Sequence, residues 1–228
     1  MKRISLLFLF AVWIFNAAFA QSAGGGISVF VPESLYRFGN GTIAFEQGLS
    51  TTIGLGPVLS VPIGFAYHST DGYLLEHKDA ASLQAPAFYG DSIIPYVALK
   101  AKAWLGSAVY LEVMGGGALN WAFSMKPTAD FAKALVANGT QRIALDRVSI
   151  EKKLGYGIIA GGAFGVKVGA VSVDLGATYR YLTTPITVEA DISRVDGGTA
   201  TTDSVRLVNA AAILSGISFK LGGTFAFK

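Results

Sequence analysis

The two histidines are the first places to look for chemistry, because hydrolysis or group transfer usually needs a base beside a carboxylate and a nucleophile. His77 follows Glu76 and lies close to Asp79 in the sequence, whereas His68 stands apart. Neighbours within one loop are weak evidence for a catalytic arrangement, and no ligand cluster has the spacing of a metal site. The chain has no cysteine, so it can form no disulfide. We therefore predict that the protein is not an enzyme and needs no cofactor or metal.

Other charged side chains recur inside apolar segments, on the positions that alternate with the apolar ones. In Val109–Ser124 the odd positions are mostly apolar, whereas the even ones include Glu112 and Asn120. A period of two predicts a β-strand with one apolar and one polar face. The ionisable residues predicted on the polar faces are Glu46, Lys100, Lys102, Glu112, Lys167, Asp174, Arg180, Arg206 and Lys220.

The same alternation recurs along the chain and predicts an all-β protein. The alternating segments lie at residues 27–31, 43–55, 59–67, 93–103, 109–124, 154–168, 171–181 and 205–219. Most of them approach the roughly 9 to 11 residues that a tilted membrane strand requires. Short turns alternate with long connections, which is typical of outer-membrane barrels. We predict an eight-stranded antiparallel up-and-down transmembrane β-barrel with short periplasmic turns and long extracellular loops.

A soluble barrel would show the same alternation with its faces exchanged, so other features must decide which face meets lipid. Only 14% of the residues are charged, well below the roughly one quarter that is usual in soluble domains. The polar faces consist mostly of small residues, which suits the narrow inside of an eight-stranded barrel. Aromatic residues gather on the apolar faces near the long-loop end, as an interfacial girdle would. These are Tyr67, Trp121, Phe123, Tyr156, Tyr179 and Tyr181.

We therefore expect the apolar faces to contact outer-membrane lipid and the charged residues to face the lumen. Inside, these charges either pair into a salt-bridged core or line a pore whose basic excess favours anions. The net charge of +3 and the lack of a basic cluster argue against nucleic acid as a partner.

The first residues have the pattern of a secretory signal peptide, with a basic start, an apolar stretch and a small-residue cleavage site. We predict a signal peptide at residues 1–20, cleavage between Ala20 and Gln21, and one barrel domain at residues 21–228. An uncleaved anchor is the alternative, but the apolar stretch is shorter than the roughly 20 residues of a spanning helix. The expected location is the outer membrane of a diderm bacterium.

Three features are predicted near the long-loop end. The parity changes around Pro185, which predicts a bulge with the barrel wall continuing above the membrane. Residues 148–152 are expected to extend the sixth strand upward, and residues 127–139 to form a short helix on the rim. In the connection at residues 70–92, we expect the apolar residues either to be exposed or to bury against the rim or the lipid headgroups; these are Tyr73, Leu74, Leu75, Phe88 and Tyr89.

Several motifs resemble the OmpW family of small outer-membrane barrels. They are, in order, GGGALNWAFS at residues 115–124, GYGIIAGGAFGVKV at 155–168, VSVDLGATYRYLTT at 171–184 and DSVRL at 203–207. The chain departs from the family pattern at its end, where ISFK continues into LGGTFAFK. The resemblance places the signal read by the barrel-assembly machinery at Phe227 and leaves the last strand boundary open.

The resemblance implies a narrow barrel that passes small hydrophobic molecules, which leave sideways through the wall. Pro62 and Pro95 interrupt possible ladder bonds and mark candidate positions for such an opening, although each is also compatible with a strand end or bulge. We predict a narrow channel or uptake pore for such solutes. The alternative is a surface-exposed adhesin, which binds host ligands through loops 70–92 and 125–152 on a closed barrel.

Overall fold

The computed structural model describes residues 22–39, 42–77, 86–128, 131, 142–196 and 199–226. The expected signal peptide, its cleavage site at Ala20 and Gln21, Phe227 and most of the predicted rim helix lie outside these ranges. Within them, no helix is long and apolar enough to cross a membrane. The elements are β1 (Ser22–Pro32), α2 (Glu33–Phe38), β2 (Ala44–Gly54), β3 (Leu59–Glu76), β4 (Phe88–Trp104), β5 (Val109–Pro127), β6 (Arg142–Lys152), β7 (Gly155–Val168), β8 (Val171–Asp196) and β9 (Thr199–Ala226).

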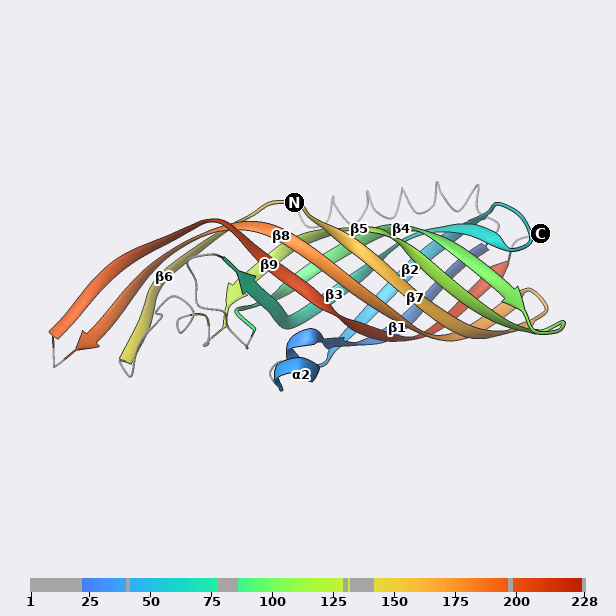
Figure 1. The fold of residues 1–228 in the computed structure, drawn as a ribbon, viewed down its shortest axis with the longest axis horizontal. Helices are drawn as coiled ribbons and strands as arrows, with labels where there is room; N and C mark the ends of the chain where they lie inside the picture. The colour runs from blue at the N-terminus through green and yellow to red at the C-terminus, as the bar shows by residue number, and fades with distance from the viewer. Residues whose placement is uncertain are drawn as a thin grey trace.

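Eight of the strands form a closed antiparallel ring, which confirms the predicted fold class. Each strand pairs with the next along the chain, except that β5 pairs with β7 because β6 stands outside the ring. The ring closes where β1 pairs with β9, from Ser22 opposite Ala226 to Pro32 opposite Gly216. Figure 1 shows the tilted strands wound around one axis. Closure leaves no unpaired edge in the ring, which is what a strand structure in lipid requires.

The two ends of the barrel differ in their connections. Three tight turns at one end each contain a glycine with positive φ, namely Gly56 at 145°, Gly106 at 100° and Gly169 at 63°. A residue with a side chain rarely adopts these backbone angles, so glycine permits the turns. Both strand ends at Ser22 and Ala226 lie at the same end. The long connections lie at the other end, as predicted.

The strands extend further at the long-loop end than the alternation indicated. β8 has 26 residues and β9 has 28, and the two pair along nearly their whole length. The predicted extension of the sixth strand is instead a separate strand, β6, which pairs with the distal part of β8. Figure 1 shows these three strands projecting beyond the other strands of the ring.

The β8–β9 register shifts just after Pro185, where Thr187 alone faces the two β9 residues Val208 and Asn209. The extra residue is therefore on β9, where Asn209 has a φ of 62°. The bulge predicted at Pro185 thus lies on the neighbouring strand, and β8 keeps its parity because Thr184, Ile186 and Val188 are all buried.

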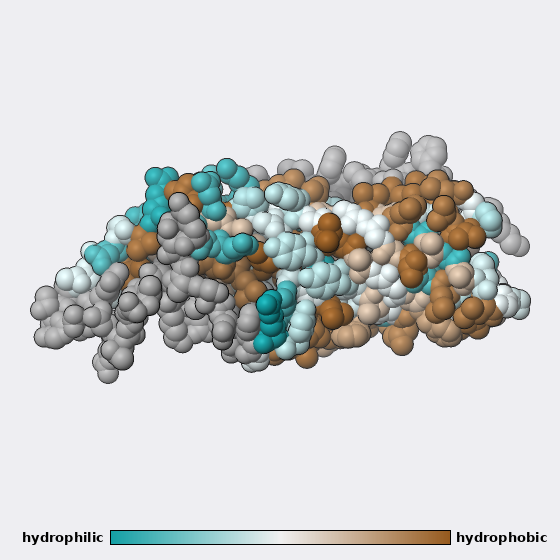
Figure 2. All heavy atoms as spheres, in the orientation of Figure 1, coloured by the Kyte–Doolittle hydropathy of each residue, from teal (hydrophilic) through white to brown (hydrophobic). Residues whose placement is uncertain are grey.

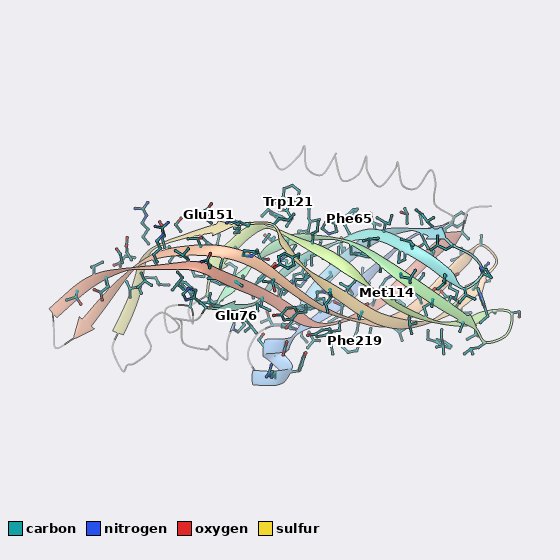
Figure 3. The ribbon with its side chains drawn as sticks, turned by 45° about the horizontal axis from the view of Figure 1, so that its top comes forward. Phe65, Glu76, Met114, Trp121, Glu151 and Phe219 are labelled. Carbon is teal, nitrogen blue, oxygen red and sulfur yellow. The ribbon has the colours of Figure 1, made fainter. Side chains whose placement is uncertain are left out.

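The outer surface of the ring is apolar. Val113, Ile158 and Leu175 have exposed fractions of 64%, 59% and 66%. In Figure 2, apolar side chains cover much of the half that holds the tight turns, whereas polar ones gather on the projecting strands. Figure 3 shows Trp121 and Phe219 pointing away from the wall. The alternation therefore sets the faces in the predicted sense, because polar side chains such as Glu46 are buried inside.

The connection at residues 70–92 is partly strand, and most of its apolar residues follow the alternative of burial. Tyr73 and Phe88 are completely buried, and Leu75 is buried as well. The reason is that β3 continues to Glu76 and β4 begins at Phe88, so these side chains turn into the upper interior of the barrel. Leu74 is half-buried, and Tyr89 is exposed.

The exposed apolar face generates a prediction about depth in the membrane. Leu175 lies four residues beyond Val171 on the same outer face of β8, about 13 Å along the strand. That is near the middle of an apolar band about 25 Å tall. We expect Leu175→Arg to lower the free energy of unfolding by about 2–4 kcal/mol, and Val171→Arg, at the band's edge, to lower it by about 0–1 kcal/mol. Urea unfolding in lipid vesicles measures both, and equal losses would contradict the lipid-facing assignment.

Candidate functional site

A buried ion pair crosses the lumen. Glu46 on β2 and Arg180 on β8 meet from separate strands, and their exposed fractions are 2% and 6%. Arg180 Nη1 donates to Glu46 Oε1 at 2.5 Å and Nη2 donates to Glu46 Oε2 at 2.7 Å. This two-pronged geometry is the strongest form of contact between a guanidinium and a carboxylate.

Three further side chains complete the cluster, which we call the plug: Ser28, Glu46, His68, Arg180 and Ser218. Ser218 donates to Glu46 Oε2 at 2.7 Å, and Ser28 donates to the same oxygen at 3.0 Å. His68 Nδ1 lies 2.5 Å from Glu46 Oε1. The plug therefore ties together five strands of the ring, β1, β2, β3, β8 and β9.

The ring of Phe30 packs against the plug. Its centroid lies 4.8 Å from that of His68, edge to face, and 5.0 Å from Arg180 Cζ. Phe30 and His68 are both fully buried. Charges taken out of water are tolerated only when they are paired and hydrogen-bonded, and the plug meets this condition for the carboxylate. It thus links β2 and β8 across the lumen.

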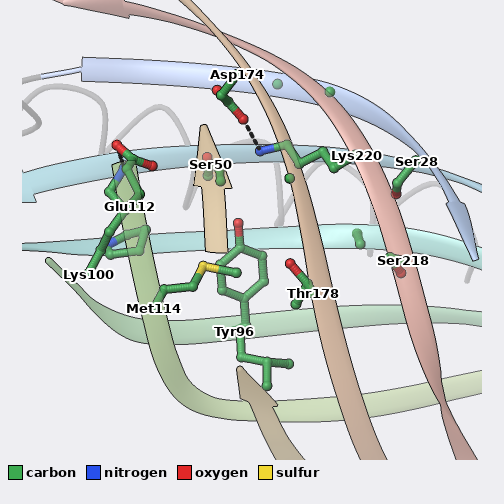
Figure 4. A pocket seen from close by; sticks show the side chains of 18 of the residues that line it. Ser28, Ser50, Tyr96, Lys100, Glu112, Met114, Asp174, Thr178, Ser218 and Lys220 are labelled. Carbon is green, nitrogen blue, oxygen red and sulfur yellow. Dashed lines mark ion pairs between the residues drawn. The ribbon is translucent and has the colours of Figure 1, made fainter. Parts of the chain in front are cut away.

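A cavity of about 140 Å³ lies between the plug and the tight-turn end. Figure 4 shows two ion pairs on different parts of its wall, Lys100 with Glu112 and Lys220 with Asp174. Tyr96, Met114 and Thr178 line the space between them. The cavity is well above the roughly 10–15 Å³ that one water molecule needs, so it is large enough for a small polar solute or several waters.

The interior on the other side of the plug is mostly apolar. Tyr73, Phe88 and Leu182 are fully buried there and belong to one hydrophobic cluster with Phe30 and Phe131. Phe131, the described residue of the predicted rim helix, packs on Phe88 with 5.0 Å between ring centroids. This arrangement places a packed apolar core, which we call the apolar compartment, towards the long-loop end and a polar cavity towards the tight turns.

One polar contact is built into this apolar compartment. Asn120 Nδ2 donates to Thr184 Oγ1 at 2.8 Å, across the position of Gly155 on β7. A Cβ at Gly155 would lie 2.5 Å from Thr184 Oγ1 and 3.0 Å from Asn120 Cβ. Glycine is therefore required for the close approach of these strands.

The residues predicted to face the lumen fall into three groups. Glu46 and Arg180 form the plug, and Lys100, Glu112, Asp174 and Lys220 line the cavity. Lys102 lies beside the cavity, and its Nζ is 2.8 Å from Glu112 Oε1 and 3.8 Å from the centroid of the Tyr110 ring. Lys167 is exposed, with its Nζ 5.9 Å from the Trp104 ring.

Arg206 does not face the lumen, so this prediction is wrong. Its side chain is 68% exposed and its Nε lies 3.0 Å from Glu189 Oε1. Both residues lie beyond the extra residue of β9 at Val208–Asn209, which exchanges the two faces of that strand. Ala210, Ala212 and Leu214 are buried on one side of it and Leu207 is buried on the other, so the even position of Arg206 faces outward.

The predicted girdle residues all lie exposed on the outer face. The exposed fractions of the six range from 37% at Tyr179 to 61% at Tyr156. Tyr67 stacks on Phe123 with 6.3 Å between ring centroids, and its hydroxyl donates to Asp91 at 3.1 Å. Their depth at a membrane interface stays a prediction.

The two prolines lie inside long strands and not at strand ends. Pro62 is buried opposite Thr52 and lines the polar cavity. The β3–β4 ladder passes from Ser60–Lys100 to Ile63–Val97 around it. Pro95 lies opposite Phe65, and the β4–β5 ladder passes from Ile93–Trp121 to Tyr96–Ala118 around it. Each proline thus coincides with a gap in one ladder.

Comparisons with known proteins concern the fold. No protein-family profile and no curated protein matches the chain. Similar solved structures include the outer membrane protein OprG from Pseudomonas aeruginosa, at 15% identity and a TM-score of 0.46, with 88% of this chain and 96% of that chain covered. Neisserial surface protein A has 11% identity and a TM-score of 0.43, with 90% and 95% covered. A major outer membrane protein from Thermus thermophilus has 14% identity and a TM-score of 0.43, with 90% and 99% covered.

The structural neighbours are thus small outer-membrane β-barrels, the kind that the OmpW-like motifs lead one to expect. At such low identity and TM-score the likeness carries no conclusion about activity. The assignment of the outer face to lipid rests on this chain's own exposed apolar side chains.

The plug generates a prediction about stability. Arg180→Met leaves the carboxylate of Glu46 buried without its counter-charge, which typically costs about 3–5 kcal/mol. The double variant Arg180→Met with Glu46→Gln removes both charges, so we expect it to lose clearly less. Urea unfolding in lipid vesicles measures both variants. A double variant as unstable as the single one would show that packing, and not the uncompensated charge, dominates.

Proposed function

We propose that this protein is a passive outer-membrane conduit that takes up small hydrophobic molecules at its long-loop end. The observation that supports this most is the division of the interior by the plug. An apolar compartment lies on the long-loop side and a charged barrier lies beneath it. An apolar solute can exchange contacts with Tyr73, Phe88 and Leu182, but it would have to displace a buried ion pair to continue along the axis.

The route out of the apolar compartment is then sideways, through the wall. Of the two gaps in the ladders, the one at Pro95 is the better candidate. The inward-facing side chains of Ile94, Ala98 and Ala118 beside it are buried and belong to the hydrophobic cluster. Pro62 lines the polar cavity itself, whereas at Pro95 the cavity is lined by the neighbouring Ile94 and Tyr96. We therefore place the lateral opening between β4 and β5.

A disulfide staple tests this route. The β4–β5 register places Pro95 opposite Leu119, and directly opposed residues in an antiparallel pair are close enough for a disulfide. The chain has no cysteine of its own, so Pro95→Cys with Leu119→Cys introduces one defined pair. We expect the oxidised variant, expressed in the outer membrane of a diderm host, to lose uptake of the small apolar dye N-phenylnaphthylamine, and the reduced variant to regain it.

A matched staple on another part of the ring is the control. Ala177→Cys with Phe219→Cys joins β8 to β9 at paired positions, and it should leave dye uptake unchanged in both redox states. Uptake that survives the β4–β5 staple would refute the lateral route. Uptake no faster than that of cells without the protein would refute the conduit itself.

A second candidate function, binding to host surface ligands, is favoured by the projecting strands β6, β8 and β9. Their exposed polar contacts include Ser204 with Asp191 at 2.6 Å and Arg206 with Glu189 at 3.0 Å. Replacing residues 189–206 by a short turn removes both of these contacts without touching the plug. Attachment of protein-bearing cells to host cells that is lost in this variant, with dye uptake absent throughout, would favour the second function.

A further inference from the structure

Most of the charges around the cavity are balanced in pairs. In the roof, Arg180 balances Glu46 through two hydrogen bonds. On the wall, Lys220 Nζ lies 3.8 Å from Asp174 Oδ1, which is close enough for an ion pair but longer than a hydrogen bond. These two pairs add no net charge to the lumen.

The third carboxylate is shared by two cations. Lys100 Nζ lies 3.1 Å and Lys102 Nζ lies 2.8 Å from the same oxygen, Oε1 of Glu112. The exposed fractions of the two lysine side chains are 17% and 24%. The six charged residues that line the cavity balance one another, so the excess of one positive charge in this described part of the lumen comes from Lys102, which lies beside the cavity on the same carboxylate.

Hydrogen-bond donors are also in excess at the cavity. Arg180 lines the cavity, and its Nε is buried without an acceptor among the described residues. The ammonium of Lys220 is too far from Asp174 for a good hydrogen bond, and its side chain is 41% exposed, so it can donate to water or to a guest. A buried donor such as Arg180 Nε that is left without an acceptor costs about 1–3 kcal/mol, so the cavity favours a guest that accepts hydrogen bonds.

We propose that the cavity binds one small monovalent anion, a halide or a carboxylate of similar size, between Lys100, Lys220 and Arg180. An uncompensated charge within a barrel surrounded by lipid is unfavourable because water is scarce around it. One bound anion neutralises the excess and supplies acceptors for the free donors. The volume of about 140 Å³ is sufficient for such an ion with part of its hydration shell.

Bromide is the probe, because it scatters X-rays anomalously and replaces chloride. In crystals of the mature protein grown in sodium bromide, we expect an anomalous peak in the cavity. In detergent solution, sodium bromide replaces sodium gluconate stepwise at constant ionic strength, because gluconate is too large for the cavity. The thermal unfolding midpoint should rise as the bromide concentration rises. Peaks confined to outer lysines, or equal effects of both salts, would overturn the proposal.

Variants that change the cavity charge in opposite directions test the mechanism. Lys100→Gln makes the lumen neutral and should weaken bromide binding by about tenfold or more. Glu112→Gln frees both lysines and should strengthen it. Lys220→Gln removes a different cation from the cavity wall, so it serves as the test if Lys100→Gln does not fold. It should also weaken bromide binding.

Lys126→Gln is the matched control, because Lys126 is exposed on β5 and its replacement removes the same charge outside the cavity. Its bromide response should equal that of the unchanged protein. A control that loses the response as fully as Lys100→Gln would show that the net charge of the whole protein, and not the cavity, governs binding, and would refute the site. The outcome does not depend on the uptake route, so dye uptake and bromide binding can fail separately.

Discussion

The structure depends on one constraint, which is that lipid offers no hydrogen-bond partner to the backbone. A strand in such a medium must pair on both of its edges, and a ring is the arrangement that achieves this for every strand at once. The pairing of β1 with β9 meets this condition. Because side chains alternate along a strand, the same ring also sorts the sequence into a face for lipid and a face for the lumen. Composition, turn chemistry and the location of the charges follow from it.

The constraint also explains why the interior is polar in the middle and apolar above. Charged side chains that avoid lipid must face the lumen, and the lumen of an eight-stranded barrel is narrow. The charges therefore meet across the lumen and pair, as Arg180 does with Glu46. Above the ring, where β6, β8 and β9 project, polar side chains reach the outer surface again. A single chain thus carries a lipid-facing barrel and a water-facing sheet.

Much of the fold could be predicted from the sequence, because alternation and glycine turns are local signals. The eight strands of the ring and their two faces followed from them. The pairing of Glu46 with Arg180 joins positions 134 residues apart, and parity shows only that both point inward. The register would have been needed to find it, and with it the contacts of Ser28 and His68. Arg206 was misplaced because the extra residue at Val208–Asn209 exchanges the faces of β9, which parity alone does not reveal. Parity also does not show how far β3 continues, so it could not decide between exposure and burial of Tyr73.

The seam of the ring has a consequence for how the molecule can be made. The seam pairs β1 with β9, from Ser22 opposite Ala226. The outer edge of each of these two strands therefore stays unpaired until the two strands meet. Until then the chain is an open sheet with two bare edges, the form most prone to pair with a neighbour. A chain cut short before β9 would not be a smaller barrel. It would be an open sheet whose unpaired backbone groups cannot enter lipid without cost. The last strand must therefore be synthesised before the barrel is stable in the bilayer.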